Sequence, residues 1–249
     1  MSIYVCSDIH GRYDRYLKLF KYIKDEDTLY ILGDVIDRHK GGIKILQDIM
    51  KRDNVVLLRG NHEDFMVNSF FVDYEENLLM TKHNDRLYLW LMDNNGGKKT
   101  YDEFIKLSED KQIEIYEFLK KLPLIVNIEV NDNKFYLGHA STINCDKEIA
   151  YERDLTFFQS EILLWDSPFD GRNIFPQVEE NKYYIHGHVY VQRIRKKYAQ
   201  KAKRKNEYEY YQKDSTICID GGCALPREYD EQTRLILLRL DDFKYEYIK

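Results

Sequence analysis

Short apolar runs recur along the chain, and several of them end at a cluster of polar residues. The length of each run and its content of β-branched and aromatic residues are typical of a β-strand. Helical patterns lie between the early runs, over residues 13–23 and 42–50. The runs span residues 3–6, 29–32, 55–58, 135–137 and 183–185, and the clusters that follow them are Ser7-Asp8, Gly33-Asp34, Arg59-Gly60-Asn61-His62, Gly138-His139 and His186-Gly187-His188.

The alternation of strands, loops and helices predicts parallel strand pairing and an α/β fold. In sheets of that kind, ligands bind beyond the carboxyl ends of the strands, where the loops gather. All five polar clusters occupy that end of their predicted strand. A single cluster is most simply a turn, because Gly, Asp, Asn and His are ordinary loop residues. Five clusters in the same topological position predict one functional site.

The rest of the chain adds to this single domain, which we expect to span residues 1–249. Residues 63–122 predict a mostly helical insertion, with Ser108 as the N-cap of a helix that reaches Leu122. Strand patterns return at residues 216–219 and 234–240. Residues 193–205 hold eight basic residues and no acidic one. They lie within a basic loop or hairpin that we predict over residues 190–214.

The composition narrows the class of protein. Hydrophobic residues make up 43% of the chain and charged residues 33%, which is typical of a globular protein. The formal net charge of −5 argues against a surface built as a whole for nucleic acid. The four cysteines form no CxxC pair, so neither a zinc finger nor a disulfide framework is predicted. Without a signal-peptide pattern or an apolar run of membrane-spanning length, we expect a cytoplasmic protein with no membrane partner.

The polar clusters supply side chains that suit divalent metal ions. Carboxylate oxygen, amide oxygen and imidazole nitrogen favour manganese, iron or zinc, and the absence of sulfur ligands argues against a structural zinc site. A shared carboxylate can bridge two ions, which then polarise a phosphate and activate water. The set is too large for one ion and fits two, for which we expect Mn²⁺: Asp8, His10, Asp34, Asn61, His139 and His188.

These segments resemble the signature blocks of the phosphoprotein phosphatases, a family of calcineurin-like metallophosphoesterases. Three blocks occur in family order: Ser7-Asp8-Ile9-His10-Gly11, Gly33-Asp34-Val35-Ile36-Asp37-Arg38 and Gly60-Asn61-His62-Glu63. The two later histidine blocks are Gly138-His139-Ala140 and Gly187-His188. Ile219-Asp220-Gly221-Gly222, Asn95-Gly96-Gly97 after Trp90, and Leu122-Pro123-Leu124-Ile125 are similar to bacterial and lambda phage members. The resemblance implies a metallophosphoesterase-type β-sandwich flanked by helices.

The resemblance also implies the metal ligands. Asp8 and His10 would bind the first ion, and Asp34 would bridge the pair. The second site would be completed by Asn61, His139 and His188.

The catalytic roles follow from the same resemblance. His62 would protonate the leaving oxygen, and Asp37 would orient its imidazole. Arg38 would hold the non-bridging phosphate oxygens in a two-pronged contact, with Asn61 beside it. Trp90 is predicted to be a core residue.

Some positions depart from the family pattern. Ser7 stands where the family has glycine, and Val189-Tyr190 replaces Thr-Pro after the last histidine. Bacterial relatives often carry an arginine at the position of Ser167, so Arg172 is the nearest candidate for a second phosphate-binding arginine. His186 is expected to support the site without binding metal.

We expect direct attack of a metal-bound hydroxide on a phosphoprotein or a small phosphate ester. Phosphoserine and phosphothreonine are the expected targets, and phosphotyrosine stays open. A symmetrical bis(5'-nucleosyl)-tetraphosphatase has the same core, but Asp37-Arg38 and Glu63 favour the protein phosphatase. A metal-dependent nuclease or nucleic-acid-end phosphatase that uses the basic stretch is a further alternative. A non-catalytic module of the same fold is disfavoured because every ligand position is occupied.

Overall fold

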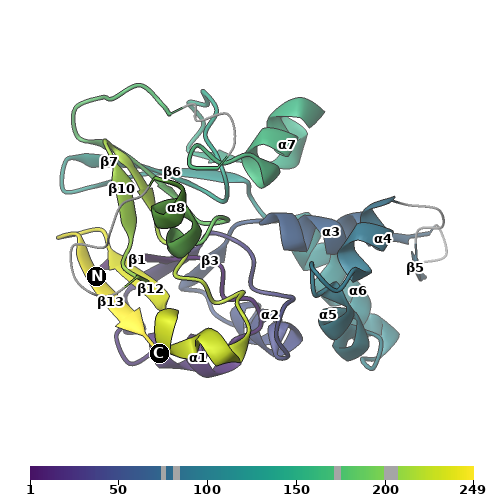
Figure 1. Cartoon of the computed structure of the whole chain (residues 1–249). Helices are drawn as coiled ribbons and strands as arrows, with labels where there is room; N and C mark the ends of the chain where they lie inside the picture. Colours follow the sequence, from purple (N-terminus) through teal and green to yellow (C-terminus); the bar gives the residue numbers. More distant parts are fainter. Residues whose placement is uncertain (74–76, 81–84, 171–174, 199–206) are drawn as a thin grey trace.

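Two β-sheets packed face to face form the centre of the molecule (Figure 1). The computed structural model describes residues 1–73, 77–80, 85–170, 175–198 and 207–249. The first sheet has the order β13-β12-β1-β2-β3, and the second has the order β10-β11-β9-β7-β6-β8. The first sheet contains β1 (Ile3–Cys6), β2 (Thr28–Ile31), β3 (Val55–Leu57), β12 (Leu235–Arg239) and β13 (Lys244–Ile248). The second contains β6 (Ile125–Val130), β7 (Asn133–Gly138), β8 (Ile149–Ala150), β9 (Lys182–His186), β10 (Tyr211–Lys213) and β11 (Thr216–Cys218).

The strands that lead into the polar clusters pair in parallel, as predicted. In the first sheet β1 pairs with β2, and β2 with β3; in the second, β9 lies between β7 and β11. Antiparallel pairs surround both parallel sets, for example β12 with β1 and β6 with β7. The carboxyl ends of the five predicted strands therefore gather at one edge of the sandwich.

Alternate side chains of the first sheet pack into two different hydrophobic clusters, one on each face. Val5 of β1 faces the second sheet, where it packs in one cluster with Ile185 and Ile236. Tyr4 and Cys6, its neighbours, belong instead to the cluster on the outer face. That face is covered by α1 (Tyr13–Leu19) and α2 (Gly42–Ile49). The period of two along the strand thus buries both faces of the sheet.

The insertion over residues 63–122 is mostly helical. Ser108 is the N-cap of α6, as predicted, although the helix ends at Lys120. A short hairpin of β4 (Phe70–Val72) and β5 (Leu78–Met80) interrupts the helices. The helices are α3 (Asn61–Ser69), α4 (Asp85–Leu91), α5 (Gly97–Phe104) and α6 (Glu109–Lys120).

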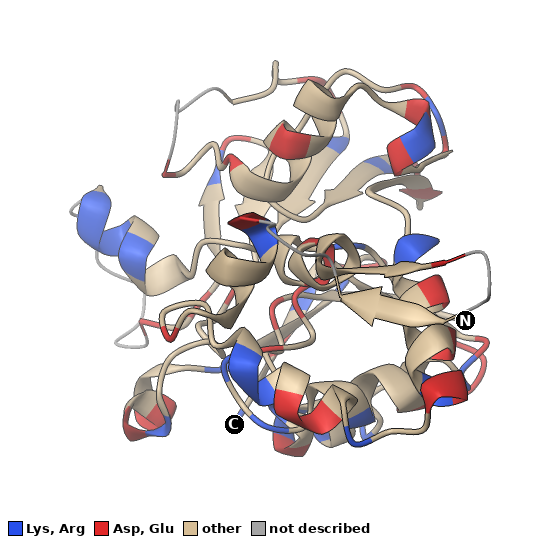
Figure 2. Cartoon of the chain, turned by 90° about the vertical axis from the view of Figure 1, so that its right-hand side faces the viewer, with Lys and Arg blue, Asp and Glu red and all other residues tan. Residues whose placement is uncertain are grey.

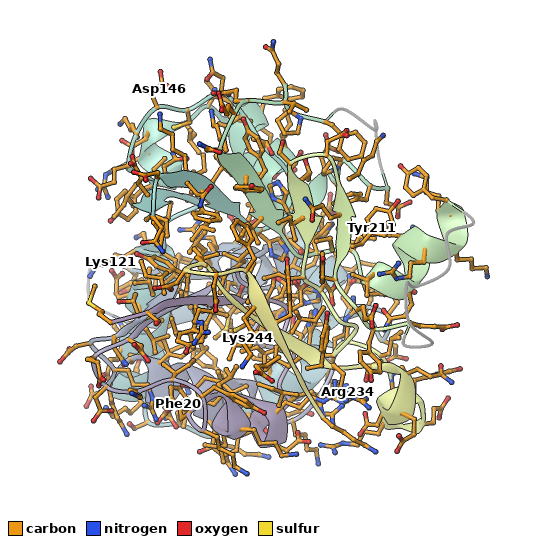
Figure 3. All side chains as sticks on the ribbon, turned by 90° about the vertical axis from the view of Figure 1, so that its left-hand side faces the viewer. Phe20, Lys121, Asp146, Tyr211, Arg234 and Lys244 are labelled. Carbon is orange, nitrogen blue, oxygen red and sulfur yellow. The ribbon has the colours of Figure 1, made fainter. Side chains whose placement is uncertain are left out.

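The remaining helices lie on the second half of the chain: α7 (Phe157–Trp165) and α8 (Val191–Lys197), with the short 3₁₀ helices η1 (Glu152–Asp154) and η2 (Arg227–Gln232). No helix in the described ranges is both long and apolar enough to cross a membrane. In Figure 3, Tyr211 and Lys244 mark two neighbouring sheet edges, β10 and β13, and side chains fill the space between the sheets.

The predicted loop or hairpin over residues 190–214 needs a correction. Its first part is the helix α8, because Val191 and Ile194 are buried one turn apart and give the segment an apolar face. Its end does form a hairpin, in which β10 pairs with β11. Residues 199–206 of the basic stretch lie outside the described residues.

The basic residues of α8 stand out in Figure 2, whereas both signs of charge are interspersed elsewhere. Arg193 forms an ion pair with Asp170. Arg195 donates to the carbonyl of Tyr210 at 2.7 Å, and Lys197 donates to that of Phe169 at 3.1 Å. Three of the basic side chains of α8 therefore already have partners within the protein.

Candidate functional site

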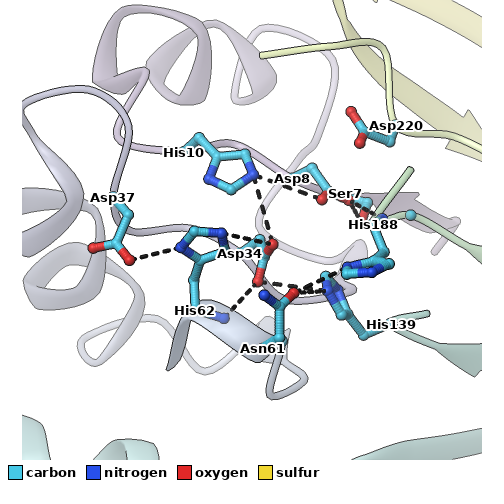
Figure 4. A network of polar contacts seen from close by, with 12 residues as sticks. Ser7, Asp8, His10, Asp34, Asp37, Asn61, His62, His139, His188 and Asp220 are labelled. Carbon is cyan, nitrogen blue, oxygen red and sulfur yellow. Dashed lines mark hydrogen bonds and ion pairs between the residues drawn. The ribbon is translucent and has the colours of Figure 1, made fainter. Parts of the chain in front are cut away.

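The polar clusters converge at the shared edge of the two sheets (Figure 4). The loops after β1, β2 and β3 contribute most of the residues, and the loops after β7 and β9 contribute one histidine each. Six of them are at most 4% exposed: Asp8, His10, Asp34, Asn61, His62 and His139. His188 is half-buried. The structure thus brings all six predicted metal ligands together, five of them buried.

The backbone at this edge is strained. Asp8, His10 and Asp34 have φ of 53°, 49° and 55°, in the left-handed region that residues other than glycine rarely adopt. The loops hold one another in place: the amide of His10 donates to the carbonyl of Asp34 at 2.9 Å. Such conformations persist where the surrounding structure enforces them, and they cluster at functional sites.

Asp34 belongs to two groups of possible ligand atoms. One group contains His10, Asp34 and His62, the other contains Asp34, His139 and His188, and the atoms of each lie within 4.8 Å of one another. Oδ2 of Asp34 is 3.6 Å from Nε2 of His10, and Oδ1 is 3.5 Å from Nε2 of His139. One carboxylate is therefore shared by both groups.

The imidazole rings present lone pairs to this space. Nδ1–H of His139 donates to the carbonyl of Leu32 at 2.7 Å, and that of His10 donates to Ile36 at 3.1 Å. Burial lowers the pKa of each of these two histidines well below its usual value, so the rings are neutral and carry a lone pair on Nε2. Nε2 of His139 then faces Oδ1 of Asn61 at 2.9 Å. Two acceptors this close can share one cation.

The carboxylates are buried and lie close to one another. Burial raises the pKa of Asp8 well above its usual value, and Asp220 adds to the shift. Burial also raises the pKa of Asp34, to which Asp8 contributes. Oδ1 of Asp8 is buried and has no hydrogen-bond partner in the described part of the chain. Oxygen and nitrogen donors of this kind, arranged around a shared carboxylate, fit two divalent cations.

The second oxygen of Asp8 is held from both sheets. The hydroxyl of Ser7 and the backbone N–H of His188 both donate to Oδ2, the latter at 3.0 Å. Gly187 lies against this contact, where any Cβ would overlap with Oδ2 of Asp8 and Oγ of Ser7. Ser7 is 1% exposed, so its departure from the family glycine places a buried donor beside a candidate ligand.

His62 is paired with a carboxylate on the side away from the candidate ligands. Its Nδ1–H donates to Oδ2 of Asp37 at 2.7 Å, and its Nε2 lies 3.9 Å from Oδ2 of Asp34. The same Asp37 oxygen accepts the indole N–H of Trp90 at 2.8 Å. The ring is therefore oriented with Nε2 toward the centre of the site.

Arg38 follows Asp37 in a tight left-handed turn, with φ of 63°. Lys99 donates to its carbonyl, and the backbone of Gly96 packs against its main chain. The guanidinium is half-buried, and its Nε has no partner among the residues that the structure describes. Arg172 lies outside those residues, so its predicted contact with phosphate stays a prediction.

Two further polar residues lie behind the site. His186 contacts Oγ1 of Thr142 at 3.0 Å and the carbonyl of Gly138 at 3.3 Å, and neither group of ligand atoms includes it. Asp220 is 2% exposed, and burial raises its pKa to about 7. Its Oδ1 accepts the backbone N–H of Gly222 at 2.8 Å.

The sequence did not reveal the supporting roles of Trp90, Ser7 and Thr100. The sequence predicts Trp90 only as a core residue, and Ser7 only as a departure from the family glycine. Thr100, which accepts the backbone N–H of Asp37 at 2.9 Å, belongs to no motif in the sequence. The departure from glycine at Ser7 was a usable signal, whereas a contact between residues 37 and 90 has no local signature.

Comparison with known proteins gives one family and several solved structures. A family model described as calcineurin-like phosphoesterase matches residues 1–192. A protein described as a candidate diadenosine tetraphosphatase superposes with a TM-score of 0.58 and 15% identity, over 99% of this chain and 92% of its own.

Two further structures give similar values. A serine/threonine phosphatase from Saccharomyces cerevisiae, similar to human phosphatase PP5, has a TM-score of 0.56 and 16% identity, over 100% of this chain and 80% of its own. A metallophosphoesterase from Sphaerobacter thermophilus has a TM-score of 0.55 and 14% identity, over 100% of this chain and 89% of its own. At these identities the three structures show a shared fold.

Proposed function

The chain belongs to the calcineurin-like phosphoesterase family and is a hydrolytic enzyme of that family, and we propose that it is a two-metal phosphomonoesterase acting on phosphoproteins. The observation that carries the proposal is the position of Asp34, whose carboxylate is shared by two groups of histidine nitrogens. Asp8 and His10 would hold one ion, and Asp34 both. The other ion would be held by Asn61, His139 and His188. Mn²⁺ suits this mixture of oxygen and nitrogen donors.

When bound, the ions supply polarisation of the phosphate and activation of water. Arg38 holds the non-bridging oxygens through its guanidinium, whose Nε has no hydrogen-bond partner among the described residues. His62 supplies the proton for the leaving oxygen from Nε2, the nitrogen that faces the site. Asp37 keeps the ring in that orientation through its contact with Nδ1.

Phosphoproteins are the proposed substrates because of the turn that contains Asp37 and Arg38. Glu63, the other feature that favoured a protein phosphatase, does not support the choice. Its carboxylate accepts the backbone N–H groups of Asp34 at 2.7 Å, Gly60 at 2.9 Å and Val35 at 2.9 Å. Glu63 therefore braces the loops and does not face a substrate.

A substrate panel tests the proposal. Protein stripped of metal and then supplied with Mn²⁺ is offered phosphopeptides, diadenosine tetraphosphate, nucleotides and 5'-phosphorylated RNA at equal concentration. We expect metal-dependent release of phosphate, with the highest kcat/KM on phosphopeptides. Preferred hydrolysis of diadenosine tetraphosphate would assign the alternative substrate to the same site. Full activity after exhaustive chelation would rule out the two-metal mechanism.

A further inference from the structure

Trp90 reaches from the helical insertion into the catalytic pair. It lies on α4, is 0% exposed and donates its indole N–H to Oδ2 of Asp37 at 2.8 Å. The same oxygen accepts Nδ1–H of His62 at 2.7 Å. Oδ1 of Asp37 is also buried and has no hydrogen-bond partner within the described ranges. Two donors from different parts of the chain thus share Oδ2, while Oδ1 accepts no hydrogen bond from the described residues.

The position of the indole is built into the insertion. A Cβ on Gly97 would overlap with the indole ring and with the carbonyl of Trp90, so glycine is needed where α5 begins. From the same helix, Thr100 accepts the backbone N–H of Asp37 at 2.9 Å. The insertion therefore holds Asp37 by its main chain and by its side chain.

We propose that Trp90 is a positioning residue for the proton donor His62, an inference that rests on the proposed function. A carboxylate can rotate about its last bond and offer either oxygen, because that torsion is broad. The indole N–H removes this freedom by fixing Oδ2, and Oδ2 in turn fixes the imidazole.

The proton transfer itself involves His62 alone. As the bond between phosphorus and the leaving oxygen breaks, the proton on Nε2 moves to that oxygen, and solvent later restores it to the ring. Trp90 is unchanged throughout and acts only through Asp37. The helical insertion over residues 63–122, which supplies none of the proposed metal ligands, would thereby control protonation of the leaving group.

The substitution Trp90→Phe in the Mn²⁺-loaded enzyme tests this role, because it keeps an aromatic ring and removes the donor. For an alkyl phosphate we expect kcat to fall about tenfold, as for the loss of one hydrogen bond to a charged group. An aryl phosphate needs little protonation of its leaving group, so its kcat should change by less than about threefold. KM and the content of bound Mn²⁺ should stay as in the wild type.

A double-mutant cycle with Asp37→Asn separates positioning from packing. If the indole acts through the carboxylate, Trp90→Phe should add less than about a twofold loss once Asp37 has been replaced. A full additional loss in that background would overturn the inference. So would an equal loss on alkyl and aryl phosphates in the single variant.

Phe70→Leu provides a matched control for packing. Phe70 is 7% exposed, and its ring lies edge-on to Trp90 at 6.2 Å between centroids. The change loosens the same core without removing a donor to Asp37. It should lower the melting temperature and leave the ratio of alkyl to aryl activity unchanged; a changed ratio would attribute the Trp90→Phe effect to packing.

A spectroscopic measurement needs no change at Trp90. The chain has two tryptophans, so nuclear magnetic resonance should resolve two indole N–H signals in protein loaded with diamagnetic Zn²⁺. Asp37→Asn should shift the Trp90 signal and leave that of Trp165 in place. Two unmoved signals would overturn the contact in solution. Failure of the proposed function is distinct, because the wild type itself would then lack metal-dependent hydrolysis.

Discussion

The two halves of the site contribute different chemistry. The loops after β1, β2 and β3 supply the carboxylates of Asp8 and Asp34 and the pair of His62 and Asp37, whereas the loops after β7 and β9 supply two imidazoles. The two halves also differ in backbone strain. Five site residues with positive φ lie in the first half, Asp8, His10, Asp34, Asp37 and Arg38, and one, His188, lies in the second. In the proposed mechanism the first half therefore carries the negative charge and the proton transfer, and the second completes one metal site.

The halves meet at two side chains. Oδ1 of Asn61 lies 2.9 Å from Nε2 of His139 and 3.0 Å from Nδ1 of His188. Oδ2 of Asp8 accepts the backbone N–H of His188 at 3.0 Å. Substitution of Asp34 should consequently affect both ions, and substitution of His62 or Asp37 should affect the proton donor. Substitution of any other proposed ligand, in either half, should affect one ion.

Asp34→Asn should have the largest effect, because its carboxylate belongs to both groups of ligand atoms. A neutral amide bridges two cations poorly, so both ions should bind more weakly. We expect kcat/KM to fall on the order of 10⁴-fold or more, since each electrostatic group commonly contributes 10²–10³. Elemental analysis after dialysis checks the metal content. Retention of one full equivalent of metal would show that Asp34 does not bridge.

His62→Asn should cost roughly 10³-fold in kcat on alkyl phosphates, within the usual range for a general acid. Metal content should stay at the wild-type level, because Nδ1 of the ring is bound to Asp37 on the side away from Asp34. The loss should be smaller for aryl phosphates. His62 also lies near His10 and Asp34, as a metal ligand would. Loss of a metal equivalent in this variant would assign it that role instead.

His10→Ala and His139→Ala compare the two halves directly. Each ring anchors Nδ1–H on a backbone carbonyl and turns Nε2 toward Asp34, so the two changes are chemically matched. Each should remove one metal equivalent and lower activity by about 100-fold or more, at or beyond the usual effect of a residue that supports a metal ligand. Calorimetric titration with Mn²⁺ should find one remaining site in either variant. If His139→Ala empties both sites, the halves are not separable.

The sequence predicts the first half of the site better than the second. Asp8 and His10, or Asn61 and His62, are one or two residues apart, so each loop carries a recognisable block. His139 and His188 are single histidines after glycine, and only the resemblance to a family assigned them to the second ion.

Packing explains what the sequence could not predict. β12 and β13 pair antiparallel at the far edge of the first sheet, and their apolar patterns carry no information about direction. The helix α8 was hidden by its basic residues, because only Val191 and Ile194 form its apolar face. The contact of Trp90 with Asp37 joins positions that are distant in sequence, and only the packed insertion brings them together.

Ser7→Ala should have the smallest effect and should stay within the first half. The change removes one of the two donors to Oδ2 of Asp8 and leaves the backbone N–H of His188 in place. Oδ1 of Asp8 is the oxygen left for a cation, since it is buried and unpartnered among the described residues. A carboxylate held by one donor is oriented less firmly. We therefore expect the affinity for one Mn²⁺ ion to fall about tenfold, the lower end of the usual effect of such supporting contacts.

Ser69→Ala is the matched control for this last change, because Ser69 is also buried and donates to the carbonyl of Phe65 at 2.7 Å, away from the carboxylates. It should leave both Mn²⁺ affinities unchanged. Ser7→Gly, which restores the family residue, should weaken the same ion as Ser7→Ala, because the hydroxyl and not the Cβ is the donor. If Ser7→Ala lowers the Mn²⁺ affinity of both sites equally, Oδ2 of Asp8 couples the two halves. The two halves would then differ in charge but would not bind metal independently.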